Sequence, residues 1–127
     1  MQTDYERIGE ARLRALVDDF IDTVAGDFII GFMFLGKDLE RIKRLEFEFA
    51  RAHLGGEGAY TGRGMRQAHA RSPINAGHFR RRLALLRTTC DKHGIDPDIV
   101  DRWIAHNQAL EAQVTDGTDC VPEARDA

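Results

Sequence analysis

Apolar residues recur every three or four positions along most of this 127-residue chain, and that spacing most limits the folds open to it. In an α-helix such spacing gathers apolar side chains on one face, whereas a half-buried strand requires alternating apolar and polar residues. The first stripe consists of Leu13, Leu16, Val17, Phe20, Ile21 and Val24. Gly26 follows this stripe and is expected to end the helix. The spacing therefore predicts helices rather than a sheet.

Three further helices are predicted from a capping residue followed by an apolar stripe. The caps are Asp38, Asn75 and Asp96, and Pro97 after the last of them suits the first position of a helix. The three stripes consist of Leu39, Ile42, Leu45 and Phe49; of Phe79, Leu83, Leu86 and Cys90; and of Val100, Trp103, Ile104, Leu110 and Val114. We expect the second of these helices to end at Gly94. The fold class is therefore expected to be all-α.

The densest apolar run, residues 28–34, is ambiguous, because its length would also allow a strand. No second stretch of the sequence offers a strand to pair with it, so we expect a buried irregular corner. The run is too short to span a membrane, and it contains Gly31.

Composition narrows the class of protein further. A net charge of −3 does not favour a nucleic-acid partner, and neither a signal peptide nor a membrane span is recognisable, so we expect a cytoplasmic protein. Cys90 and Cys120 fit no metal-binding spacing and are expected to be free thiols. The chain has the length of one domain, which we place at residues 1–114, followed by a polar, disordered tail over 115–127.

One histidine, His69, lies on a short predicted helix that ends at Ser72-Pro73. Met65 lies one turn before it, and Ile74 and Phe79 follow it. A neutral imidazole between apolar side chains suits the axial position of a flat, hydrophobic metal cofactor. A buried histidine on an amphipathic helix is the alternative interpretation, and the rest of the chain must decide between them.

A longer motif surrounds this histidine and reads Tyr60-x-Gly62-Arg63-x-Met65-x-x-x-His69. Upstream, Phe34 lies four residues before the capping Asp38, and Phe49 is followed by Leu54-Gly55-Gly56. In this order the residues resemble the group 1 truncated hemoglobins, small two-over-two globins. The resemblance covers roughly residues 4–114. It implies a truncated globin fold, a two-over-two helical sandwich around heme b.

The resemblance also implies roles for individual residues. His69 would be the fifth, proximal ligand of the iron, which leaves the sixth position open to O2, NO, CO or peroxide. The residues implied to contact the cofactor are Phe34, Ile42, Glu46, Phe49, Arg63, Met65, Arg66, Ile74 and Phe79. Arg63 and Arg66 are candidates to pair with the heme propionates, and a solvated surface charge is the alternative for each. His53 and His78 are expected at the surface or at the rim of the pocket.

Several arginines gather in the middle third of the chain, and the usual meaning of such a group is a solvated helical face. They are Arg51, Arg63, Arg66, Arg71 and Arg80 to Arg82.

The distal side departs from the family pattern. Group 1 proteins have a tyrosine in the second helix and usually a glutamine in the distal helix. The same alignment places Ile21 at the tyrosine position, and places Ile42 and Glu46 on the distal helix, one turn apart and facing the iron. Glu46 lies between Ile42 and Phe49 on the inward stripe. The alternative is that its side chain turns to the edge of the pocket and reaches solvent.

The protonation of Glu46 would decide its chemistry. An ionised carboxylate only accepts hydrogen bonds, whereas burial without a cation raises a carboxyl pKa and yields a neutral acid that donates. Such a group could serve peroxide chemistry as an acid/base catalyst, or bind ferric iron directly. Ordinary oxygen storage is in doubt for this reason.

Several functions remain open from the sequence alone. The first is a heme protein that binds diatomic gases. The second is a globin-fold enzyme for peroxide- or O2-dependent oxidation or NO dioxygenation, with Glu46 as acid/base and a reductase as candidate partner. The third is a heme-based gas sensor, which would need a separate output partner. The fourth is a globin-like protein that has lost heme, which His69, Met65 and Phe34 argue against.

Overall fold

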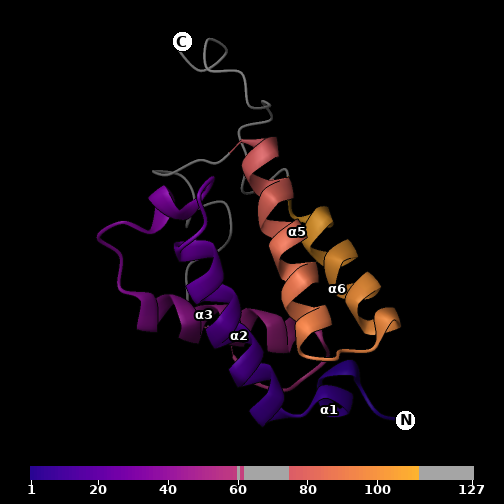
Figure 1. Cartoon of the computed structure of the whole chain (residues 1–127). Coiled ribbons are helices and arrows are strands. Elements are labelled where there is room, and N and C mark those ends of the chain that lie inside the picture. The colour runs from indigo at the N-terminus through magenta and orange to yellow at the C-terminus, as the bar shows by residue number, and fades with distance from the viewer. Residues whose placement is uncertain (60, 62–74, 112–127) are drawn as a thin grey trace.

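The computed structural model describes residues 1–59, 61 and 75–111 (Figure 1). Its elements are α1 (Asp4–Ile8), α2 (Glu10–Ala25), the 3-10 helix η1 (Gly31–Phe34), α3 (Leu39–His53), α5 (Ala76–Lys92) and α6 (Pro97–Ala109). Within the described ranges there is no β-strand, which confirms the all-α prediction. Figure 1 shows α2 crossing α3, while α5 and α6 run side by side.

Helix α2 supplies the centre of the core. The six residues of its predicted stripe are all buried, and the helix contacts α1, η1, α3 and α5. Burial of each large apolar side chain contributes roughly 1.5–3 kcal/mol. Gly26 is the C-cap of the helix, as predicted.

Helix α3 has two apolar faces, and the sequence stripe identified only one of them. Asp38 caps the helix as predicted, by accepting a hydrogen bond from the backbone N–H of Arg41. The residues of α3 that are fully buried are Phe47 and Ala50, not those of the predicted inner face. Leu39, Ile42, Leu45 and Phe49 are each half-buried, and Leu39 and Ile42 pack against the edge of the core. At about 100° per residue, their face lies roughly 100° around the helix from the core face.

The corner after α2 is irregular, as predicted, but the expectation that it is buried was wrong. Ile30 and Gly31 are buried, and a Cβ on Gly31 would lie 2.7 Å from the carbonyl oxygen of Ala25. The large side chains that point outward instead are Phe28, Ile29, Phe32 and Leu35. Met33 and Phe34 pack against the core, so the run is split between buried and exposed side chains around the close approach at Gly31.

Helices α5 and α6 follow the predicted pattern closely. The side chain of Asn75 accepts a hydrogen bond from the backbone N–H of His78, and Gly94, with φ +70°, follows the end of α5. The predicted residues of α5 are buried, as are Val100, Trp103 and Ile104 of α6. Leu110 lies just beyond α6, and Val114 is outside the described residues.

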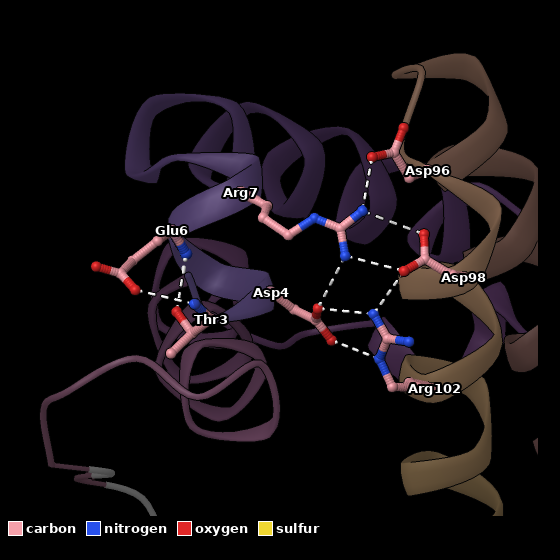
Figure 2. A network of polar contacts seen from close by, with 7 residues as sticks. All are labelled: Thr3, Asp4, Glu6, Arg7, Asp96, Asp98 and Arg102. Carbon is pink, nitrogen blue, oxygen red and sulfur yellow. Dashed lines mark hydrogen bonds and ion pairs between the residues drawn. The ribbon is translucent and has the colours of Figure 1, made fainter. Parts of the chain in front are cut away.

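The N-terminal helix is held against α6 by charged side chains (Figure 2). Arg7 donates hydrogen bonds to Asp96 and Asp98, and Arg102 donates to Asp4 and Asp98, with distances of 2.8–3.2 Å. We call these five residues the α1–α6 network. Asp96 occupies the predicted cap position, but its carboxylate accepts from Arg7 rather than from the start of α6.

Of the predictions about the cysteines and the C-terminal tail, the structure tests only the one about Cys90. Cys90 is a free, buried thiol, and burial raises its pKa to about 12. Cys120 and the predicted tail over 115–127 lie outside the described residues. None of the helices among the described residues has the length and hydropathy needed to cross a membrane.

Candidate functional site

The predicted site residues divide into two groups. Those outside the described residues are Arg63, Met65, Arg66, His69 and Ile74, so the proximal assignments stay predictions. Those described are Phe34, Ile42, Glu46, Phe49 and Phe79. Phe79 is buried in the core at 4% exposure, and the other four are half-buried.

The second face of α3 brings several of these residues together. Ile42, Glu46, Phe49 and His53 follow one another at intervals of one turn, so they share one side of the helix. Phe34, from η1, packs against the edge of the core. A half-buried apolar face of this kind suits a flat hydrophobic partner. We call it the α3 outer face.

Glu46 has a cationic partner on a different helix. Arg82 of α5 donates from Nη2 to the Oε1 of Glu46 at 2.6 Å, and the two side chains are 24% and 12% exposed respectively. The central carbon of the guanidinium lies 5.0 Å from the ring centroid of Phe20, on α2. The condition for a neutral acid, burial without a cation, is therefore not met, and little of the Glu46 side chain is in solvent.

Two histidines border this region in different ways. The ring of His53 lies 4.2 Å from that of Phe49 and 5.1 Å from that of His106, between ring centroids. Burial lowers the pKa of His53, and the charge of His106 lowers it further. His78 stands at the start of α5, with its ring edge-to-face with Phe32 at 5.6 Å. Neither is a fully solvated surface histidine, because both are half-buried.

Buried polar atoms at this site lack hydrogen-bond acceptors or donors. Nε2 of His53, Nδ1 of His78 and Nη1 of Arg82 are buried and have no hydrogen-bond partner in the structure as described over 1–59, 61 and 75–111. A buried polar group without a partner costs roughly 1–3 kcal/mol, so native proteins contain few of them. Two of these residues are tied to the α3 outer face, His53 by its place on it and Arg82 by its contact with Glu46, and this supports the binding of a further group there.

These features fit a heme. The macrocycle is flat and apolar and matches the half-buried side chains of Phe34, Ile42 and Phe49. A ligand or propionate of the cofactor would offer acceptors to the buried donors. The half-buried apolar side chains and the buried donors without partners are therefore compatible with heme.

Arg82 is the site residue that the sequence interpretation missed. It was assigned with Arg80 and Arg81 to a solvated face. The signal that could have found it is its position three residues after Phe79 and one before Leu83, which places it beside the buried stripe of α5.

A hollow elsewhere on the surface serves a different purpose. It lies between α2 and α3 and is lined by Arg14, Val17, Asp18, Glu40, Lys43, Arg44 and Phe47. Lys43 contacts Asp18 at 2.8 Å and Asp22 at 2.9 Å, and these carboxylates raise its pKa. These ion pairs join α2 to α3.

Comparison with solved structures defines the class of fold. The Fe(III) form of the truncated hemoglobin from Tetrahymena pyriformis superimposes with a TM-score of 0.84 at 23% identity, covering 90% of this chain and 98% of that one. The group II truncated hemoglobin from Bacillus anthracis also gives 0.84, at 23% identity, covering 97% and 98%. The structure is therefore a two-over-two truncated globin fold, as the sequence predicted.

Sequence comparison places the chain in a family. The model of the bacterial-like globin family matches residues 3–116, so the chain belongs to the bacterial-like globins. A curated relative, the group 1 truncated hemoglobin GlbN of Mycolicibacterium paratuberculosis, is 29% identical over 114 residues, which cover 89% of this chain and 84% of the relative. Membership of this family implies heme binding and the binding of small gaseous ligands such as O2.

Proposed function

We propose that this protein holds heme b against the α3 outer face, with His69 as proximal ligand, and binds small gaseous ligands on the distal side. The observation that carries the proposal is that α3 uses one face for the core and leaves a second apolar face only half-buried. Ile42 packs against the edge of the core, and the half-buried face that it shares with Phe49 suits contact with a flat apolar group.

Each predicted contact has a specific role in this proposal. Phe34, Ile42 and Phe49 would contact the macrocycle, and Phe79 would support them from the core. Met65 and Ile74 would lie on the proximal side, and Arg63 and Arg66 would pair with the propionates. Heme, when bound, supplies an iron that takes a diatomic ligand. The protein's part is to hold it, to exclude water and to present polar groups to the ligand.

The contact of Glu46 favours gas binding over peroxide chemistry. Acid/base catalysis would need a carboxyl group that is free to give up and take a proton. In the structure Glu46 instead accepts a 2.6 Å hydrogen bond from a permanent cation. Its oxygen is engaged as an acceptor, and this supports a structural and electrostatic role rather than an acid role.

Titration of the purified apoprotein with hemin, followed by absorption spectroscopy, tests the proposal. We expect a Soret band that saturates at one heme per chain, and a CO complex after reduction. His69→Ala should weaken heme retention strongly, because the coordinate bond from the proposed proximal imidazole to the iron would be lost. The control is His93→Ala, since His93 lies at the far end of α5 and contacts Asp19 at 2.9 Å. Equal heme retention by His69→Ala and the parent protein would contradict the proposal.

A further inference from the structure

The guanidinium of Arg82 uses only part of its hydrogen-bonding capacity. Nη2 donates to Glu46, whereas Nη1 is buried without a hydrogen-bond partner in the described part of the chain. Folding does not leave a buried cationic donor in this state without a cost, because the group has lost its water. Arg82 therefore offers a preformed, charged donor to an acceptor that the described part of the chain does not supply.

Three helices fix the position of this donor. Glu46 on α3 holds one end of the guanidinium, and Phe20 on α2 lies beneath it at 5.0 Å. Arg82 itself is on α5, beside Phe79 and Leu83, which are buried. A donor held from three sides is oriented before any ligand binds, so little ordering is needed when one arrives.

The donor is next to the α3 outer face because its partner belongs to that face. Glu46 is one turn from Ile42 and three residues from Phe49. Ile21, which follows Phe20 in α2, is buried and apolar and cannot donate a hydrogen bond. Arg82 therefore offers a permanently charged donor on this side, where Ile21 of α2 offers none.

We propose that Arg82 is the distal hydrogen-bond donor of this globin, and that it selects small ligands that carry negative charge. The inference rests on the proposed function, because it assigns the ligand class of the same heme site. Glu46 is a positioning residue: it holds the guanidinium and offsets part of its charge. Neutral CO gains little from such a donor, whereas a small anion gains both a charge-assisted hydrogen bond and a Coulombic attraction.

Azide binding to the ferric, heme-loaded protein is the first measurement. We expect Arg82→Leu to weaken azide binding by about 10-fold or more, the loss expected for one hydrogen bond to a charged group. Arg82→Lys should recover part of the affinity, because it keeps the charge but not the planar fork. Glu46→Gln should tighten azide binding, because it removes the competing negative charge. CO binding to the ferrous protein should change far less in all three variants.

The matched control is Arg81→Leu. Arg81 is the adjacent residue on the same helix, but its Nη2 donates to Asp27 at 2.6 Å, at the corner after α2. Its removal should leave azide affinity unchanged. An equal loss of azide affinity in Arg81→Leu would show a general effect of surface charge and would overturn the assignment to Arg82.

The apoprotein provides a second readout that does not depend on heme. Urea unfolding of Glu46→Gln, Arg82→Leu and the double variant should reveal coupling between the two side chains. Coupling together with a loss of azide affinity supports the inference, whereas coupling with unchanged azide affinity shows a structural pair only and overturns it. If no variant and no parent protein binds heme, the proposed function fails and the inference fails with it. If the protein binds heme but Arg82→Leu leaves azide affinity unchanged, only the inference about Arg82 fails.

Discussion

The α1–α6 network and the Glu46–Arg82 pair both consist of hydrogen bonds between arginine and carboxylate groups, but they differ in their exposure to solvent. In the network, Asp98 accepts from both Arg7 and Arg102, and the side chain of Asp98 is 49% exposed (Figure 2). In the pair, one carboxylate meets one guanidinium, at 12% and 24% exposure. The network lies where α1 meets α6 and is partly exposed to solvent, and the pair lies beside the α3 outer face.

The difference teaches how to separate charges that hold a fold from charges that await a ligand. Solvent and neighbouring charges satisfy the network, and exposed pairs of this kind contribute little individually. The pair is shielded from solvent, so water does not supply the hydrogen-bond acceptor that Nη1 of Arg82 lacks. What indicates a ligand site here is a buried donor without a hydrogen-bond acceptor, rather than the number of charged side chains.

The largest expected effect comes from breaking the buried pair. Glu46→Leu should lower the free energy of unfolding of the apoprotein by about 2 kcal/mol, below the ~3–5 kcal/mol of a fully buried pair because Arg82 keeps partial contact with water. Urea unfolding, followed by the fluorescence of the single tryptophan, Trp103, measures this. The double variant Glu46→Leu/Arg82→Met should recover most of the loss. If Glu46→Leu and the parent had the same free energy of unfolding, the buried pair would contribute no more to stability than an exposed ion pair, which would contradict the comparison.

Acid should act in part through the network. Hydrogen bonds from Arg7 and then Arg102 hold the pKa of Asp98 well below its ordinary value of 3.8. A carboxylate with a lowered folded-state pKa contributes stability above its unfolded pKa, and that stability disappears as the pH falls through the folded value. We therefore expect stability to fall below about pH 4, and to fall less steeply in Asp98→Asn.

The control for this pH dependence is Asp101→Asn. Asp101 is on the same helix, its side chain is 70% exposed, and it contacts Arg87 at 3.2 Å. Acid unfolding curves of the three proteins provide the comparison. A flattening in Asp101→Asn as large as that in Asp98→Asn would show that the network has no special part in acid stability.

The smallest expected effect is that of Arg102→Ala. This change removes one cation of the network, whose side chain is 50% exposed, so we expect a modest fall in stability at low salt. The fall should shrink at ~1 M salt, where the Debye length is about 3 Å. The effect of Glu46→Leu should persist at the same salt concentration. Unfolding midpoints at two ionic strengths measure both, and an equal salt response of the two regions would contradict the comparison.

Much of the fold could be predicted because local signals agreed with one another. The stripe from Leu13 to Val24 and the caps Asp38 and Asn75 mark helices by rules that depend on neighbouring residues only. Phe47 and Ala50 were missed because α3 has two apolar faces, and a sequence stripe does not say which of two faces meets the core. The exposure of Phe28 and Phe32 depends on the close approach of Gly31 to Ala25, which is a tertiary contact.

The candidate site was predictable only in part for a related reason. The resemblance placed Ile42, Glu46 and Phe49 on one face of a helix, and the structure agrees on that placement. It did not indicate that Arg82, 36 residues later, donates to Glu46. Long-range pairing of charges depends on how α3 and α5 pack, and neither helix carries that information in its own sequence.

Resonance Raman spectroscopy of the reduced, heme-loaded protein tests the central claim most directly, because it detects the bond between iron and the proximal imidazole. The account predicts an iron–histidine stretching band in the parent protein, its loss in His69→Gly, and its return when imidazole is added to that variant. His93→Gly should keep the band without added imidazole. An unchanged band in His69→Gly would contradict the claim that His69 holds the heme.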